Sequence, residues 1–177
     1  MSRSREHYII DGYNVIYAWP ELSALTGDLS EARDRLIHIM MEYGAYERYD
    51  ITIVFDALYT TNEVHKERHG PHLTVLFTAA GETADSCIER LAYESVRLHR
   101  EVHVVTSDGA EQSVILGAGA YRLPSGELRK RVRRVKEKLR REYIEGPVLP
   151  LARNEVISHI DKEVTEKLDR LRKNLDY

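Results

Sequence analysis

Residues 8–14 read Tyr8-Ile9-Ile10-Asp11-Gly12-Tyr13-Asn14, a short apolar run followed directly by an acid, a glycine and an amide. The run is continuously apolar rather than alternating, which is typical of a strand buried on both faces of a parallel sheet. Gly12 permits a sharp turn at the point where the strand ends. The stretch therefore predicts a buried strand that delivers Asp11 and Asn14 to one edge of a sheet.

The chain repeats this pattern in Ile53-Val54-Phe55-Asp56, in Val104-Val105-Thr106-Ser107-Asp108 and in Gly81-Glu82-Thr83-Ala84-Asp85. Because the carboxyl ends of parallel strands meet at one crevice, we expect these acids to converge there. Clustered carboxylates repel one another unless a cation is present, and Mg²⁺ or Mn²⁺ prefers oxygen ligands. The pattern therefore predicts a divalent-metal site and phosphodiester chemistry.

Apolar runs and helical periodicities alternate along the chain, which is typical of a doubly wound α/β fold. Strands are predicted at 8–10, 51–55, 73–77 and 102–106, with a fifth at 120–123. Helices are predicted from Asp28 through Tyr43, from Thr83 to about His99, from Ser107 or Asp108 to about Gly117, from Ser125 to about Ile144, and from about Arg153 to Asn174. A length of 177 residues suits one domain with a helical appendage.

Composition excludes several classes of protein. The single cysteine, Cys87, permits no intramolecular disulfide and no Cys-rich zinc site. The first seven residues lead into a short strand without a long apolar segment, so we expect neither a signal peptide nor a membrane partner. We therefore expect a cytoplasmic protein.

Asp11 and Asn14 have a structural alternative, because either side chain could simply cap the following helix. That alternative explains each residue alone, but it explains less well why three other acids follow strands or begin a helix. We predict that Asp11 binds metal and that Asn14 positions water or a phosphate oxygen without adding negative charge.

Glu82 and Asp85 are spaced i,i+3 at a helix start, so both can point to the same side. Their alternative role is stabilisation of the helix dipole, worth about 0.3–1 kcal/mol for an acid in any first turn. We predict Asp85 and Asp108 as metal ligands beside Asp11, although Asp108 could also be a helix cap. Asp56 and Glu82 take second place among the catalytic candidates, and Asp56 could orient Asn14 or a water.

The segment from Arg129 to Glu142 holds nine Lys or Arg residues and two Glu residues, a local charge of +7 within a net charge of −3. This excess of positive charge favours contact with a polyanion over a merely solvated helix face. The candidates for RNA binding on this helix are Arg129, Lys130, Arg133, Arg134, Lys136 and Arg140.

Residues 58–72 are predicted to form a loop that grips RNA, with Tyr59 stacking on a base and Lys66 or Arg68 binding phosphate. Tyr13 could also stack on a base, or it could belong to the core. The alternatives for the loop are a zinc site at its three histidines and a mobile segment of mixed charge.

The motifs Asp11-Gly12-Tyr13-Asn14, Phe55-Asp56-Ala57, Gly81–Asp85 and Thr106-Ser107-Asp108 together resemble the signatures of NYN domains, a branch of the PIN-like metal-dependent ribonucleases. In order and spacing they are similar to the YacP-like group of bacterial NYN proteins. The resemblance extends from about Tyr8 to about Tyr143.

This resemblance implies a PIN-like α/β fold of three layers, with a central, mostly parallel sheet of about five strands and C-terminal helices. It places a nuclease domain at 1–145, including the basic helix 125–144, and a helical extension at 150–177. It also implies a Mg²⁺- or Mn²⁺-dependent endoribonuclease that acts on single-stranded RNA and associates with translating ribosomes in mRNA decay. The family's catalytic positions correspond to Asp11, Asn14, Asp85 and Asp108, and less closely to Asp56 and Glu82.

We therefore expect a metal-dependent endoribonuclease whose products carry 5′-phosphate and 3′-hydroxyl ends. One alternative is a non-catalytic RNA- or ribosome-binding adaptor that retains the fold. Another is a receiver domain phosphorylated on aspartate, but Gly12 stands where that domain has a second acid, and no lysine follows the last predicted strand.

Overall fold

The computed structural model describes residues 6–56, 63–107, 115 and 117–145. The chain divides into two compact units, residues 1–137 and 138–177. The sheet, its helices and the candidate site all belong to the first unit. The last described turns of helix α6 belong to the second. No helix among the described residues is both long enough and apolar enough to cross a lipid bilayer.

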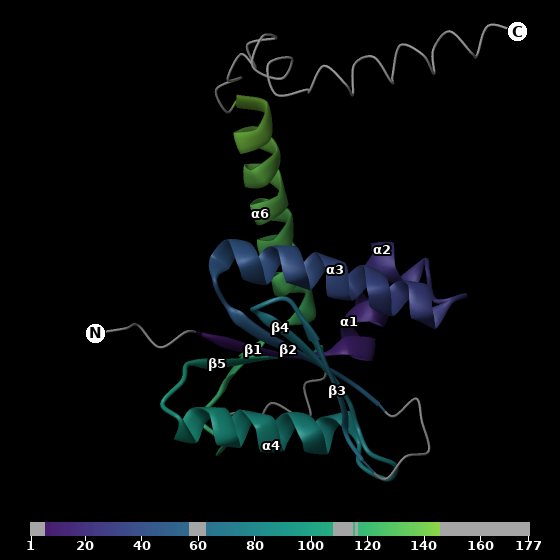
Figure 1. The fold of residues 1–177 in the computed structure, drawn as a ribbon, viewed down its shortest axis with the longest axis vertical. Helices are drawn as coiled ribbons and strands as arrows, with labels where there is room; N and C mark the ends of the chain where they lie inside the picture. The colour runs from purple at the N-terminus through teal and green to yellow at the C-terminus, as the bar shows by residue number, and fades with distance from the viewer. Residues whose placement is uncertain (1–5, 57–62, 108–114, 116, 146–177) are drawn as a thin grey trace, which may run out of the picture. The chain divides into compact units, whose positions relative to one another are not determined.

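A six-stranded sheet forms the centre of the first unit, in the order β3-β4-β2-β1-β5-β6 (Figure 1). Its strands are β1 (His7–Asp11), β2 (Asp50–Phe55), β3 (His65–His69), β4 (Leu73–Phe77), β5 (Val102–Val105) and β6 (Tyr121–Leu123). All neighbouring pairs are parallel except β3 with β4, which is antiparallel. The predicted α/β class and all five predicted strands are confirmed.

Strand β3 was not predicted, because residues 58–72 were expected to form a loop. Its sequence, His65-Lys66-Glu67-Arg68-His69, has no apolar residue, so periodicity gives no strand signal. The segment forms a strand because it turns back at Gly70, where φ is +71°, and pairs with the outer side of β4. An edge strand needs few apolar residues, since much of it faces water.

Five helices are described in full: α1 (Gly12–Ala18), α2 (Pro20–Ser23), α3 (Leu29–Glu47), α4 (Ala84–Arg97) and α6 (Ser125–Glu145). Asp28 caps α3 and Thr83 caps α4 by accepting hydrogen bonds from backbone N–H groups in the first turn, so both helices start where they were predicted to start. Helix α2 was not predicted, and α1 was considered only as the helix that Asp11 or Asn14 could cap. The predicted helix after Ser107 and the one at 153–174 fall largely or wholly outside the described residues.

The helices cover the two faces of the sheet in separate layers (Figure 1). Helix α4 packs against β1, β2 and β5 on one face, and α1 and α3 pack on the other face, where α3 contacts β2 and β4. The core beneath α4 contains Ile9, Val54, Leu76, Val102 and Val104 from the strands. Each such side chain contributes about 1.5–3 kcal/mol when fully buried. Burial on both faces explains why the strands read as continuous apolar runs.

Candidate active site

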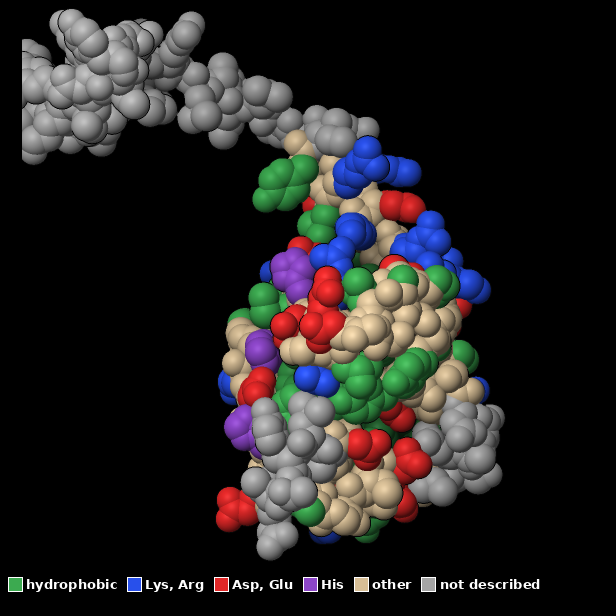
Figure 2. Space-filling view, turned by 90° about the vertical axis from the view of Figure 1, so that its right-hand side faces the viewer, with side chains coloured by type: hydrophobic (Ala, Val, Ile, Leu, Met, Phe, Trp, Pro, Cys, Tyr) green, Lys and Arg blue, Asp and Glu red, His purple; other side chains and the backbone are tan. Residues whose placement is uncertain are grey.

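The carboxyl edge of the parallel strands brings together the ends of β1, β2 and β5. Asp11 is the last residue of β1 and is paired in register with Val54, so Asp56 lies two residues beyond that pair, directly after the end of β2. Ser107 follows β5 by two residues, and α4 begins at the same edge with Ala84 and Asp85. Figure 2 looks onto this side of the molecule and shows acidic side chains gathered on it, with Lys and Arg side chains along α6.

Gly12 sets the position of Asp11 because helix α1 starts directly against the ring of Phe55. A Cβ atom at residue 12 would lie 2.2 Å from Cε1 of Phe55, closer than any van der Waals contact allows. The Phe55 ring is fully buried and stacks on Phe77, with 5.6 Å between ring centroids. Any larger residue at position 12 would therefore have to displace the Phe55 ring for the chain to turn from β1 into α1 as it does.

The side chain of Asp11 is half-buried and accepts a hydrogen bond from the backbone N–H of Asn14 at 3.1 Å. The capping role considered for Asp11 is thus present in the structure. Burial raises the pKa of the Asp11 carboxyl, the bond from Asn14 opposes that shift, and the charges of Asp85 and Asp56 raise the pKa further. Three carboxylates from three segments therefore lie close enough to repel one another.

Asn14 links the end of β1 to the end of β5. Its Oδ1 accepts hydrogen bonds from the backbone N–H of Ser107 at 2.8 Å and from Ser107 Oγ at 2.7 Å. Arg122 on β6 in turn donates to the carbonyl of Ser107 at 3.3 Å. The oxygen of the Asn14 amide is therefore engaged by the protein, and the two donors of its NH₂ group are the part that can face a ligand.

Asp56 holds helix α4 in place at this edge. Its Oδ1 accepts a hydrogen bond of 2.7 Å from the backbone N–H of Ala84, the first residue of α4. The carboxylate thus satisfies one of the N–H groups that a helix leaves unpaired at its start. In this structure Asp56 orients α4, and with it Asp85, rather than Asn14.

Glu82 and Asp85 differ in their surroundings. Glu82 forms an ion pair of 2.9 Å with Arg90, which lies two turns along α4. Asp85 is exposed, and its charge acts on Asp11. The structure therefore places Asp85 with Asp11 and engages Glu82 elsewhere. Asp108 and Tyr59 lie outside the described residues.

Among the described residues, one set of three or more His, Cys, Asp and Glu side chains has ligand atoms within 4.8 Å of one another, namely Glu6, Glu101 and His103. His103 Nε2 lies 3.4 Å from Glu6 and 3.3 Å from Glu101. These residues stand at the amino ends of β1 and β5, the opposite edge from Asp11. Sequence reasoning missed them, although the adjacent parallel strands would have placed Glu6 beside Glu101.

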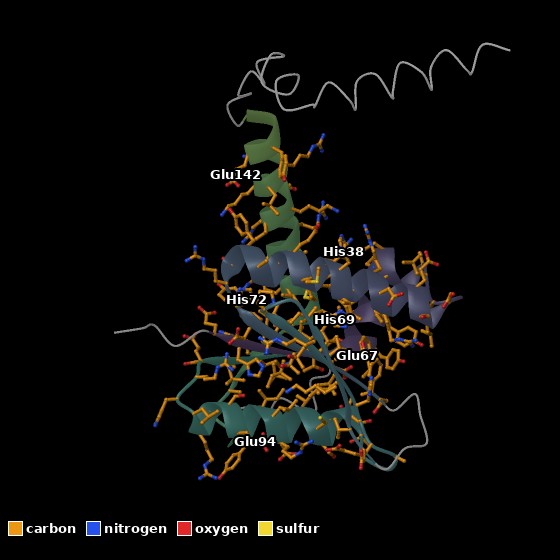
Figure 3. All side chains as sticks on the ribbon, viewed as in Figure 1. His38, Glu67, His69, His72, Glu94 and Glu142 are labelled. Carbon is orange, nitrogen blue, oxygen red and sulfur yellow. The ribbon has the colours of Figure 1, made fainter. Side chains whose placement is uncertain are left out.

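The donors at the carboxyl edge suit a hard divalent cation. Asp11, Asp56 and Asp85 are carboxylates, and a cation among them would offset the repulsion that raises the pKa of Asp11. The zinc alternative at His65, His69 and His72 gains no support. His65 and His69 on β3 each pair with Glu67, at 3.1 and 3.2 Å, and His72 lies 3.6 Å from Asp50. Figure 3 shows His69 and Glu67 together on this strand.

The predicted RNA-binding residues have different surroundings. Arg129 Nε donates hydrogen bonds to both carboxylate oxygens of Glu21, at 2.9 and 3.0 Å. Lys130 Nζ lies 3.6 Å from a carboxylate oxygen of Glu127. The remaining four candidates on α6 are exposed: Arg133, Arg134, Lys136 and Arg140. Tyr13 is half-buried, with its ring against Phe55 and its hydroxyl accepting a bond of 3.1 Å from Arg33. Lys66 and Arg68 lie exposed on β3.

A mostly parallel sheet with helices on both faces, and with carboxylates at the carboxyl ends of its strands, defines a PIN-like protein. A model of the family described as the YacP-like NYN domain matches residues 8–173. The chain belongs to the YacP-like NYN domain family, as the motifs at Asp11–Asn14 and Gly81–Asp85 predict.

Known relatives agree with this assignment. The chain is 38% identical over 154 residues to the uncharacterized protein YacP of Bacillus subtilis, an alignment that covers 84% of this chain and 90% of that protein. It also resembles the crystal structure of Rae1 (YacP) from Bacillus subtilis, with a TM-score of 0.63, 36% identity and 95% of each chain covered. A tryptophan-to-leucine variant of Rae1 gives a TM-score of 0.69 at 34% identity, covering 94% of this chain and 99% of the other. NYN domains are generally nucleases and usually depend on divalent metals.

Proposed function

We propose that this protein is a divalent-metal-dependent endoribonuclease that cleaves single-stranded RNA at the carboxyl edge of its sheet. The observation that carries the proposal is the approach of Asp11, Asp56 and Asp85, from three separate segments, close enough for the charges of the other two to raise the pKa of Asp11. Membership of the NYN family supports a nuclease and favours RNA as its substrate.

Asp11 and Asp85, with Asp108, are the residues proposed to hold Mg²⁺ or Mn²⁺. When bound there, the cation would neutralise charge on the phosphodiester and lower the pKa of a nearby water. Oxygen donors from several segments match the preference of both ions. Cleavage by water would leave 5′-phosphate and 3′-hydroxyl ends.

The protein's own contribution is to fix these groups before RNA arrives. Gly12 and the cap on α1 orient Asp11, while Asp56 orients the start of α4 that carries Asp85. Ser107 holds the Asn14 oxygen, so that the Asn14 NH₂ group can donate to a phosphate oxygen. Such preorganised donors and charges lower the cost of reaching a charged transition state.

The exposed cations on α6 support contact with a polyanion, and we include Arg133, Arg134, Lys136 and Arg140 in the RNA- or ribosome-binding surface. We further propose that the protein acts in the cytoplasm, on mRNA associated with translating ribosomes. In this proposal residues 1–145 form the nuclease domain and residues 150–177 a helical extension.

Cleavage of end-labelled single-stranded RNA by the purified full-length protein tests the assignment. We expect cleavage in Mn²⁺ or Mg²⁺, none in EDTA, and a loss of at least about a hundredfold in Asp11→Asn and Asp85→Asn, since each removes a charge acting at the reacting phosphate. Asp34→Asn, an exposed acid on α3, should cleave as the wild type does. The same assay on translating ribosomes shows whether they are required.

Unchanged cleavage in both Asp11→Asn and Asp85→Asn would refute the proposed site. RNA binding without cleavage under any of these conditions would favour the adaptor. Titration calorimetry with Mn²⁺ adds an independent measurement, because both variants should bind the ion more weakly than Asp34→Asn does.

A further inference from the structure

The face of the sheet that α4 covers is apolar in one half and polar in the other. Ile9 of β1 and Val54 of β2 lie beneath α4 in the core. Beyond them, strand alternation places Thr52, Thr74 and Arg68 on the same face, because these three residues are paired across β2, β4 and β3. Helix α4 contacts β1, β2 and β5, so the polar half of this face lies beside the helix.

A cavity of about 290 Å³ occupies this polar half of the face. We call it the cationic trough and define it by His7, Thr52, Lys66, Arg68, Thr74 and Arg100, which all line it. Its charged walls are three cationic side chains and one carboxylate, that of Asp50, which pairs with Arg100. Leu76 and Leu91 add apolar surface.

The alternation of β3 separates positive from negative charge. Lys66 and Arg68 point into the trough, whereas Glu67 falls on the opposite face, where it pairs with His65 and His69. Burial and then the charge of Arg100 lower the pKa of His7 to about 4, and the charge of Asp50 opposes that shift. His7 is therefore neutral at neutral pH, while Lys66, Arg68 and Arg100 together exceed the single negative charge of Asp50 in the trough.

The trough leads away from the acidic edge. Lys66 is paired with Leu76, and Leu76 is paired with Val54. Relative to Lys66, Asp56 therefore lies two strands away across the sheet and two residues further along the strand direction of β2. Strand spacing and rise put the backbones of Lys66 and Asp56 about 12 Å apart, on the same face of the sheet. A nucleic acid strand with a phosphate at the acidic edge can therefore place a neighbouring phosphate beside Lys66.

We propose that the cationic trough binds phosphate groups of the RNA strand that flank the cleaved phosphodiester, with Lys66 as the first contact. This inference rests on the proposed function for the identity of the strand. A carboxylate ligand at the cleavage site repels RNA, so attraction must come from cations nearby. The half-buried Thr74 hydroxyl adds a hydrogen-bond donor for phosphate oxygens, and Leu76 and Leu91 can contact ribose or base.

Binding of a fluorescein-labelled single-stranded RNA of ten nucleotides, in EDTA to prevent cleavage, tests the trough through Lys66. This lysine is exposed and forms no ion pair with another described residue. Its replacement should therefore leave folding intact, and a thermal melt of each variant checks this. The control is Arg35→Glu, an exposed residue of α3 on the other side of the sheet. Anisotropy is measured over a range of salt concentrations for the full-length protein.

We expect Lys66→Glu to weaken RNA binding about tenfold and Lys66→Met about threefold, and each to reduce the slope of log K against log salt by about 0.7. Arg35→Glu should change binding less than about twofold. Equal effects of Lys66→Glu and Arg35→Glu would overturn the inference. So would phosphorus NMR showing that inorganic phosphate needs Lys66 while RNA does not.

Cleavage in Mn²⁺ separates this inference from the proposed function. Cleavage that requires Asp11, combined with wild-type RNA binding in both Lys66 variants, would refute the trough and leave the nuclease intact. RNA binding that requires Lys66, without cleavage either of free RNA or on translating ribosomes, would support phosphate binding by the trough and refute the nuclease. A wild-type protein that binds no RNA would refute both.

Discussion

At the scale of the residue, Gly12 is the position where the identity of one side chain most directly determines the geometry of the site. We expect Gly12→Ala to lower the free energy of unfolding by about 1–3 kcal/mol, because the new methyl group must displace the buried Phe55 ring. Gly27→Ala is the control, since nothing lies within 4 Å of a Cβ at that position. Urea denaturation of both variants measures the difference, and equal stabilities would contradict this account.

The residue scale also shows why only part of the site was predictable. Asp11 and Asp85 follow from motifs that fix their place relative to a strand end or helix start, so their approach could be expected. The partner of Glu82 could not be predicted, because the motif fits equally well whether Glu82 faces the site or turns to Arg90. The bonds from Ser107 to Asn14 depend on strand order, which local sequence does not determine.

At the scale of the element, a hydrogen bond to Asp56 holds the start of α4 at the end of β2. Replacement of Asp56 by Asn and by Ala should therefore have different effects on stability. Asp56→Asn keeps an oxygen to accept the bond from Ala84, so we expect stability close to that of the wild type. Asp56→Ala leaves the N–H of Ala84 without that acceptor and should cost about 1–3 kcal/mol. Urea denaturation compares the two, and equal losses would show that the bond contributes little.

Elements with strong periodicity were predictable and those without it were not. The continuous apolar runs of β1, β2 and β4 and the capped, amphipathic helices α3 and α4 carry their own signals. Strand β3 has no such signal, because pairing with β4 and not its own composition makes it a strand. Helix α1 entered only as the alternative in which Asp11 caps a helix, because seven residues are too few to show a helical period.

At the scale of the whole molecule, His7 should make stability depend on pH. It is 6% exposed, its ring nitrogens share hydrogen bonds with Ser95 and Thr52, and its pKa is lowered to about 4 from 6.5. The unfolded chain therefore takes up a proton below pH 6.5 that the folded chain accepts only near pH 4. Stability is full above pH 6.5 and falls as the pH drops.

Between pH 7.5 and pH 5 we expect His7 to lower the free energy of unfolding by about 2 kcal/mol. Urea denaturation at both pH values measures this change. His7→Gln retains hydrogen-bonding groups but cannot titrate, so its loss between the two pH values should be smaller by that amount. His38→Gln, at an exposed position on α3, should behave as the wild type does. Identical pH dependence in all three proteins would contradict the assignment to His7.

The two edges of the sheet carry a final consequence. Strand β3 presents Lys66, Glu67 and Arg68 along one edge, and β6, at the other edge, is only three residues long. A charged strand and a very short one are both poor templates for another chain's backbone. The strands at the centre of the sheet can thus carry long apolar runs while the two edge strands oppose strand-to-strand aggregation. The cations of β3 would provide this protection in addition to binding RNA.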